Sequence, residues 1–162
     1  MTFIRRSLYL LLFAPLVLGR CKKSDESSIE FTGITRTDNF GTPLSNDPDD
    51  WTFSDQSAKK EASLFQSAFS TICTPGYVYK ITTYPNPCSD VFQLHIDKPS
   101  AARLEIRVID KNFRQLIAND AITSSAVALN VSTLGVKGIV RLYYKLIDNG
   151  CEFRGHGDIL IQ

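Results

Sequence analysis

The sequence contains few of the residues that most often carry catalysis or bind metals. Only two of its 162 residues are histidines and four are cysteines. The Gly-x-Ser-x-Gly motif of many hydrolases does not occur. His95, His156 and Cys88 do not have the spacing of a recognisable metal site. We therefore expect no catalysis, no cofactor and no metal.

The sequence also lacks an excess of charge of either sign. It has 18 Lys and Arg residues against 17 Asp and Glu residues, a formal net charge of +1. Loss of residues 1–20 would remove three arginines and no acid, and would change this charge to about −2. The basic residues are scattered among acidic ones, which is not the electrostatic pattern of nucleic-acid binding. We expect no nucleic-acid partner.

No apolar run is long enough to cross a membrane. The longest, Leu8 to Leu18, is shorter than the roughly 20 residues that a transmembrane helix needs. It follows the Arg5-Arg6 pair and ends at Gly19, which is the order of a secretory signal. A buried core helix is less favoured because charged residues follow directly. Residues 1–20 are therefore predicted to be a signal peptide.

The residues after this run, Leu18-Gly19-Arg20-Cys21, resemble the lipobox of bacterial lipoproteins. In that family a peptidase cuts before the cysteine, which then receives a lipid. The charged tract 22–26 is similar to tracts that direct some lipoproteins to the outer face of the outer membrane. The resemblance implies a lipid on Cys21 and a location in the cell envelope, anchored to the outer membrane.

Two segments separate Cys21 from the C-terminal half. Residues 21–50 are rich in Ser, Thr, Asp, Asn and Gly and show no sustained period, so we expect a flexible tether. Its acidic run, 46–50, lacks the spacing of a calcium loop and should be a solvated turn. Residues 51–72 carry an apolar stripe that predicts a short helix from about 55 to 67, docked on the following domain. Trp51 is expected to be a core residue rather than a ligand-binding one.

Residues 73–162 change character, because β-branched and aromatic residues recur there with period two between turn signals. This spacing of short strands is typical of a β-sandwich. Asp148-Asn149-Gly150 indicates a hairpin, and Gly155-His156-Gly157-Asp158 a bulge or the entry to a strand. About seven strands are predicted, near residues 77–84, 92–97, 103–108, 114–117, 126–131, 140–146 and 158–161.

The motif Tyr84-Pro85-Asn86-Pro87 opens this half and carries a second resemblance. With the Ser89-Asp90 continuation and the alternating strands that follow, it resembles the type A C-terminal sorting domain of type IX (Por) secretion cargo. The resemblance covers about half of the chain. It implies a mainly β fold, an Ig-like or FN3-like antiparallel sandwich, with the motif as its sorting signature.

The four cysteines fit an exported protein in which one is lipidated and two form a disulfide. In an Ig-like sandwich the first and last strands commonly run side by side, which puts Cys73 and Cys151 at one end and Cys88 at the other. We expect a disulfide between Cys73 and Cys151, with Cys88 free. Pairing of Cys73 with Cys88 is the alternative.

Three functions remain open. The favoured one is a membrane-anchored, non-catalytic interaction or structural module that contacts envelope proteins or glycans. The second is a type IX sorting signal, which ranks lower because its removal would leave a product too short to form a domain. The third is a small hydrolase in which His156 acts with Asp158, although these residues place no nucleophile.

Overall fold

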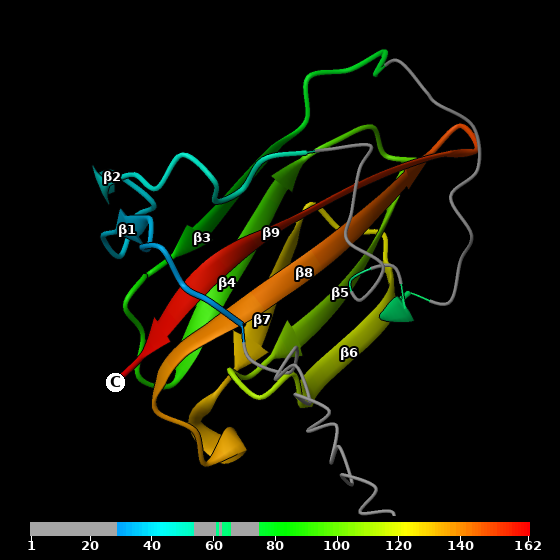
Figure 1. Ribbon diagram of the computed structural model, residues 1–162. Coiled ribbons are helices and arrows are strands. Elements are labelled where there is room, and N and C mark those ends of the chain that lie inside the picture. The colour runs from blue at the N-terminus through cyan, green and yellow to red at the C-terminus, as the bar shows by residue number, and fades with distance from the viewer. Residues whose placement is uncertain (1–28, 54–60, 62, 66–74) are drawn as a thin grey trace, which may run out of the picture.

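The computed structural model describes residues 29–53, 61, 63–65 and 75–162. Residues 1–20, Cys21, Cys73 and most of segment 51–72 lie outside this part, so the signal peptide, the lipid site and the docked helix stay predictions. The described elements are β1 (Arg36–Thr37), β2 (Pro43–Ser45), β3 (Lys80–Tyr84), β4 (Val91–Asp97), β5 (Arg103–Ile109), β6 (Gln115–Ile122), β7 (Ala126–Asn130), the 3₁₀ turn η1 (Ser132–Leu134), β8 (Gly138–Asp148) and β9 (Cys151–Ile161) (Figure 1).

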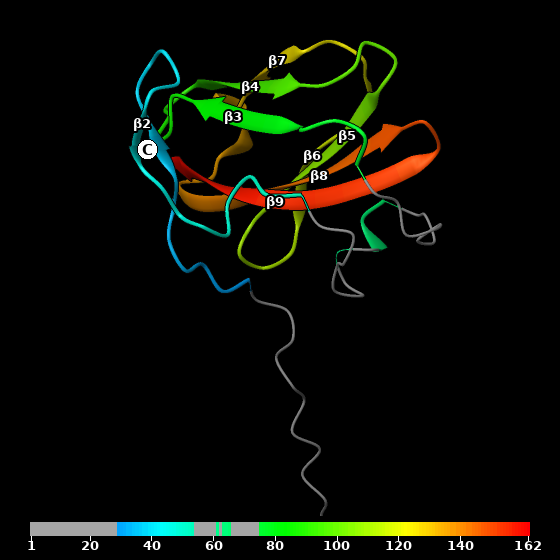
Figure 2. The ribbon, with the colours of Figure 1, turned by 90° about the horizontal axis from the view of Figure 1, so that it is seen from above.

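The fold is mainly β, as expected, and every ladder between its strands is antiparallel. The strands form a small sheet β1-β2, a three-stranded sheet β3-β4-β7 and a four-stranded sheet β6-β5-β8-β9. Figure 2 shows the three-stranded sheet lying over the four-stranded one. The main apolar core fills the space between these two layers.

Alternation along the strands explains the layers. On β8 the side chains of Val140, Leu142, Tyr144 and Leu146 are completely buried in the core between the sheets. The residues between them face the other side of the sheet. Strands were predicted in the seven places where β3 to β9 lie, and the last of these strands is longer than expected, since it begins at Cys151.

The turn between β8 and β9 is the predicted hairpin. Asn149 and Gly150 form its two-residue loop, with φ of 49° and 79°. Two positive φ values in succession match the twist of a hairpin, and Asn-Gly adopts them at low cost. Asp148 and Cys151 pair across the loop and fix the register of the whole ladder.

The prediction of a bulge or strand entry at residues 155–158 is wrong. β9 pairs with β8 continuously from Cys151 to Ile161, without a shift in register. Gly155 and Gly157 therefore stand in the middle of a regular strand, and their lack of a side chain has another cause.

The outer face of the four-stranded sheet is charged but largely covered. The ammonium of Lys145 lies 2.8 Å from a carboxylate oxygen of Glu105 and 3.7 Å from one of Glu152. The buried ring of Phe65 packs over this layer, with the Arg107 guanidinium 5.2 Å from the ring centre. Aromatic cover of this kind keeps water from the ion pairs and adds cation–π attraction.

The expectation of a flexible tether does not hold for residues 29–50. They contain β1 and β2, and Thr35, Thr37 and Asp50 are buried. We call residues 29–53 the N-terminal strap, because they lead from the β5–β6 turn, where Ile29 bonds to Lys111, across to the β3 and β9 edges of the two sheets (Figure 1). Their composition gives no periodic signal because isolated polar side chains, and not an apolar face, hold most of the strap in place.

Candidate functional site

The motif Tyr84-Pro85-Asn86-Pro87 forms a buried clamp at the end of β3. Both of its prolines follow cis peptide bonds, and Asn86 is completely buried. The Asn86 amide nitrogen donates to the carbonyl oxygens of Thr35 (2.7 Å) and Asp158 (2.8 Å). Its amide oxygen accepts a bond of 2.9 Å from the backbone N–H of Leu160. One side chain thus joins the motif to the strap and to β9.

Backbone bonds extend the clamp in both directions. Thr37 and Asn86 exchange two backbone hydrogen bonds, of 2.9 and 3.3 Å. Cys88 donates to the carbonyl of Leu160 and accepts from the N–H of Gln162, so this segment runs parallel to the end of β9. The residues that carry the resemblance to sorting domains therefore hold the fold together, and Asn86 offers no surface to a partner.

Asp50 makes a second connection between the strap and β9. One carboxylate oxygen accepts from the backbone N–H of Thr35 (2.7 Å) and the other from that of Asp158 (2.9 Å). Burial raises the pKa of Asp50, while these two hydrogen bonds oppose the rise. The acidic run 46–50 forms a turn, as predicted, but its last residue, Asp50, is buried and not solvated.

The last residues of the strap explain the glycines of β9. The Trp51 indole lies where a side chain at residue 157 would stand, and the Thr52 carbonyl where one at residue 155 would stand. Trp51 also donates its backbone N–H to the carbonyl of His156 at 2.8 Å. Its partly buried ring stacks on Tyr144 and packs against the core, as predicted, and it also lines a cavity of about 540 Å³.

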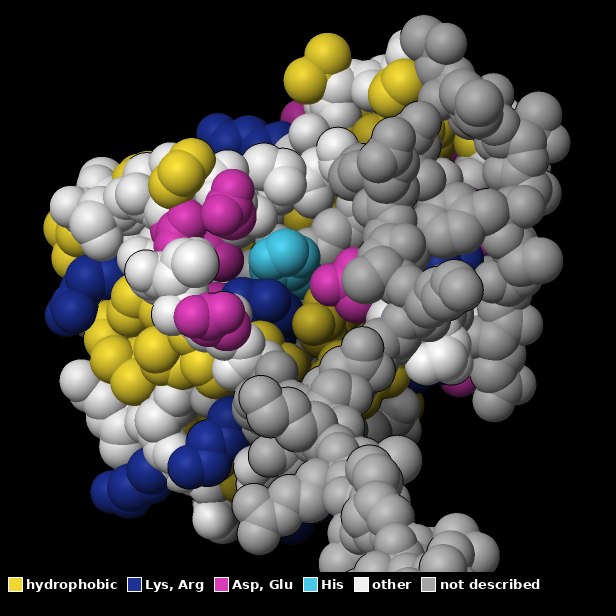
Figure 3. Space-filling model, viewed as in Figure 1, with side chains coloured by type: hydrophobic (Ala, Val, Ile, Leu, Met, Phe, Trp, Pro, Cys, Tyr) yellow, Lys and Arg dark blue, Asp and Glu magenta, His cyan; other side chains and the backbone are white. Residues whose placement is uncertain are grey.

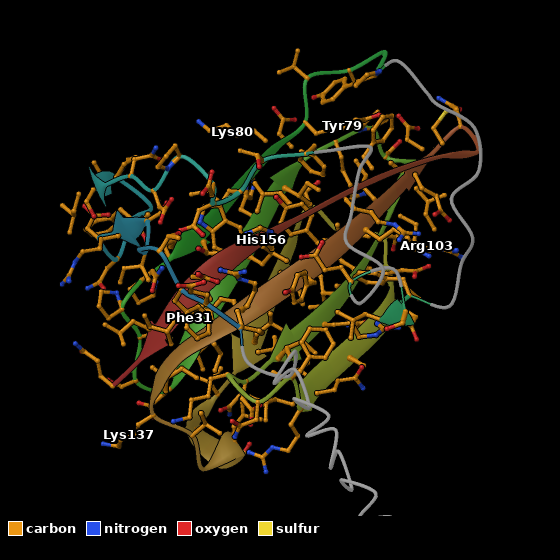
Figure 4. The ribbon with its side chains drawn as sticks, viewed as in Figure 1. Phe31, Tyr79, Lys80, Arg103, Lys137 and His156 are labelled. Carbon is orange, nitrogen blue, oxygen red and sulfur yellow. The ribbon has the colours of Figure 1, made fainter. Side chains whose placement is uncertain are left out.

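His156 lies on the opposite face of β9, beside three polar side chains. Its ring centre is 5.8 Å from that of Tyr143, and Figure 4 places it near the middle of this face. Figure 3, drawn in the same view, shows a histidine side chain between acidic side chains, with a basic one next to it. Burial, followed by the nearby Arg141 guanidinium, lowers the pKa of His156.

The His156–Asp158 pair considered for a hydrolase is not assembled. Both carboxylate oxygens of Asp158 bind Arg141, at 2.7 and 2.8 Å, so the carboxylate orients the guanidinium and not the imidazole. Burial also raises the pKa of the neighbouring Tyr143 to about 12. These groups form a buried polar network of the sheet and not a nucleophile with its base.

Metal binding finds no support in the described part of the chain. Within it, no group of three His, Cys, Asp or Glu side chains lies close enough together to hold an ion. His95 is exposed on β4, as predicted for the polar face of that strand.

An aromatic groove opens where the chain enters β3, and it is the best candidate for a ligand site. Its two adjoining cavities, of about 540 and 350 Å³, share Gly76, Tyr77 and Tyr79. Tyr77 is 37% exposed and Val78 is 88% exposed. Tilted rings packed behind them form the floor: the ring centres of Phe53 and Phe153 lie 5.5 and 5.2 Å from that of Tyr79. An exposed aromatic surface over a rigid floor is typical of a binding site.

Two carboxylates fix the tyrosines of this groove. Tyr77 donates its hydroxyl to Asp97 at 2.6 Å, and Tyr79 donates to Asp148 at 2.7 Å. Burial and the Asp148 carboxylate raise the pKa of Tyr79 to about 12, so its hydroxyl keeps its proton at neutral pH. The groove therefore offers ring faces together with the Asp148 carboxylate, which lines the smaller cavity, and this is the chemistry of sugar recognition as well as of peptide binding.

The cysteines lie at opposite ends of β9. Cys151 begins the strand and is disulfide-bonded, whereas Cys88 is a buried free thiol beside its far end. Burial raises the pKa of Cys88 to about 11, which leaves the thiol protonated and unreactive. Cys73 lies outside the described residues, so its pairing with Cys151 remains a prediction.

Sequence reasoning placed Asn86 in a motif but missed Thr35, Asp50 and the groove. Tyr77 and Tyr79 were assigned to the first strand, which in the structure begins only at Lys80. Tyr77 and Tyr79 alternate with Val78 and Lys80, and this alternation led to the strand assignment. The same alternation is compatible with an exposed aromatic pair.

Comparison with known proteins does not assign the chain to a family. No protein-family model matches the chain, and no curated protein matches it. In the described residues, no helix has the length and apolar character that crossing a membrane requires.

Proposed function

We propose that this chain is an exported lipoprotein, anchored to the outer membrane through a lipid on Cys21, whose β domain is a non-catalytic binding module. The observation that carries the proposal is that the N-terminal strap belongs to the same packed body as the sheets. Asp50, Trp51 and Asn86 all join it to β9.

The strap also favours the anchored module over the sorting signal. A removable sorting domain needs a boundary at which the chain can be cut without breaking the fold. Residues 29–53 lie before the sorting-type motif, yet they pack against Tyr144 and Gly157 in the core. A cut between strap and sheets would leave the edge of β9 open, so the geometry favours retention of the whole chain.

The strand order supports an Ig-like sandwich as the fold type. In an Ig domain the first, second and fifth strands share one sheet, and the third, sixth and seventh share the other. With β3 as the first strand, the sheets β3-β4-β7 and β6-β5-β8-β9 follow this arrangement, and the fourth strand, β6, joins the second sheet. Such sandwiches commonly serve as binding modules and carry their partners on loops and edges.

The aromatic groove is the surface through which we expect the module to bind. Its exposed ring and the Asp148 carboxylate suit a glycan of the cell envelope, whose pyranose rings stack on aromatic faces and whose hydroxyls donate to the carboxylate. An envelope protein is the other partner class that this surface accommodates.

Anchoring is tested by expression in an outer-membrane-bearing host, followed by intact-mass measurement beside a Cys21→Ser variant. A mature product that begins at acylated Cys21 and still ends at Gln162 would support the anchored module. An unacylated product without residues 73–162 would overturn it and favour the sorting signal.

Binding is tested by probing the mature protein against an array of bacterial envelope glycans. Tyr77→Ala should reduce binding at least tenfold, whereas Phe40→Ala, which removes an exposed ring (89%) from the loop between β1 and β2, should leave it unchanged. Equal loss in both variants, or binding only to a protein fraction, would contradict a glycan site in the groove.

A further inference from the structure

A second groove lies at the other end of the molecule, between the β5–β6 turn and the start of β8. It has a volume of about 470 Å³, and Phe31, Val136 and Ile139 form its apolar lining. Lys111, Arg114 and Lys137 line it as well, and we call it the basic groove. Figure 4 labels Lys137 and Phe31 here, and Figure 3 shows basic side chains gathered in the same region.

The positive charge of the basic groove is available to a ligand. Lys111 and Lys137 are exposed and form no ion pair with any residue in the described part of the chain. Asp110 is the acid in the lining, and it is buried. Its carboxylate already binds the Arg114 guanidinium at 3.0 Å and two backbone N–H groups of its own turn. Three cations thus face one engaged carboxylate.

The course of the chain places this groove next to the proposed anchor. Ile29, the first described residue, donates its backbone N–H to the carbonyl of Lys111 at 3.0 Å. Cys21 precedes Ile29 by eight residues, which even when extended span at most about 28 Å. If Cys21 carries the lipid, the basic groove cannot lie farther than this from the tether's membrane end.

We propose that the basic groove binds the phosphate groups of anionic lipid headgroups in the membrane that holds the Cys21 anchor. The inference rests on the proposed function for the position of the membrane. Cations attract an anionic bilayer surface over roughly one Debye length, about 8–10 Å, so the short connection brings Lys111 and Lys137 into this range once the domain tilts toward the bilayer. Phe31 and Val136 then face the less polar part of the headgroup layer.

The test uses the mature lipoprotein in nanodiscs of phosphatidylcholine alone or of phosphatidylcholine with phosphatidylglycerol. Acetylation of each lysine is followed by mass spectrometry. In the anionic discs, the acetylation rates of Lys111 and Lys137 should fall at least about threefold, and high salt should restore them. Lys80, which is exposed on β3 in the other layer, is the internal control and should react equally in both discs.

A substitution sharpens the test. Lys137→Gln should weaken the protection of Lys111 in anionic discs, because the phosphate loses one of its partners, whereas Lys80→Gln should not. Equal reactivity of Lys111 in both discs would overturn the proposal. So would equal protection by free inorganic phosphate added to neutral discs, since the ligand would then not be a lipid. The intact mass reports acylation of Cys21 separately, so loss of the anchor is distinguished from loss of headgroup binding.

Discussion

Strand β9 has two neighbours, and they hold it in different ways. On one side β8 pairs with it over its entire length, from Cys151 to Ile161, through backbone groups that every residue carries. On the other side the partners are Asp50, Trp51, Asn86 and Cys88, which satisfy the edge one group at a time. An open edge strand invites pairing with another chain, and here the side chains of Asp50 and Asn86, together with the backbone of Trp51 and Cys88, close it.

The contrast teaches where single substitutions matter. A ladder tolerates many side chains because its bonds are made by the main chain, whereas the bonds that Asp50 and Asn86 make to the edge are lost when either side chain is replaced. We therefore expect the largest effects of polar substitutions at the strap and the clamp, although most of the apolar burial lies between the sheets.

Asn86→Ala should have the largest effect. It leaves the Thr35 and Asp158 carbonyls and the Leu160 N–H without their partner, and each buried polar group left unsatisfied costs about 1–3 kcal/mol. We expect the free energy of unfolding to fall by about 4 kcal/mol in denaturant titration.

Two variants frame this measurement. Asn86→Asp keeps the shape and the acceptor but loses both donors, and should also destabilise strongly. Asn112→Ala removes an exposed amide from the β5–β6 turn and should be nearly neutral. A loss below about 1 kcal/mol for Asn86→Ala would mean that the ladder alone secures β9.

Gly157→Ala tests the strap from the opposite side. The added methyl group would meet the Trp51 indole, and overpacking of this kind costs about 1–3 kcal/mol. Thermal unfolding should show the loss, and Trp51→Ala in the same chain should relieve much of it. Gly76→Ala is the control, because nothing lies within 4 Å of a methyl group there. Additive effects of the two substitutions would argue that Trp51 does not pack on β9.

Asp50→Ala should destabilise the protein by about 2 kcal/mol, since it leaves the N–H groups of Thr35 and Asp158 unsatisfied. Asp50→Asn retains one acceptor and should fall between this variant and the wild type. Asp49→Ala, at the exposed neighbour, provides the matched baseline in the same urea titration. Equal stability of the Asp49→Ala and Asp50→Ala variants would mean that the Asp50 carboxylate does not help to hold the strap on β9.

On the ladder side of β9, the partner strand and the hairpin were predictable from the sequence, although only residues 158–161 of β9 itself were predicted as strand. Alternation of Val140, Leu142, Tyr144 and Leu146 with polar residues gives β8, and Asn149-Gly150 gives the hairpin that sets the register of β9. Both signals are local, because side-chain period and turn conformation depend on adjacent residues alone.

The other side was not predictable, because its contacts join distant positions through single residues. Asp50 and Asp158 are 108 residues apart, and nothing near Asp50 in the sequence separates it from Asp47 or the exposed Asp49 of the same run. Gly155 and Gly157 were read as a local irregularity because the strap that excludes their side chains leaves no trace around them in sequence. For the same reason Tyr77 and Tyr79 could be taken for strand residues.

His156→Gln should have the smallest effect. It distinguishes the contribution of the His156 imidazole from that of its backbone carbonyl. The His156 carbonyl accepts the hydrogen bond from the Trp51 N–H of the strap, and its imidazole lies beside Tyr143 in the polar network on the other face of the sheet. Because the pKa of the folded state is lowered, the unfolded state binds more protons below about pH 6.5, and the stability of the wild type should decline as pH falls through that value.

In His156→Gln this decline should be shallower, by less than about 1 kcal/mol between neutral pH and about pH 5, with little change at neutral pH because the Trp51 bond to the backbone remains. Denaturant titrations across this range measure the slope, and the same substitution at exposed His95 is the control. If His156→Gln instead lowered stability equally at every pH, the imidazole would support the strap side of β9 directly, and the division of the strand into a ladder side and a strap side would have to be redrawn at this residue.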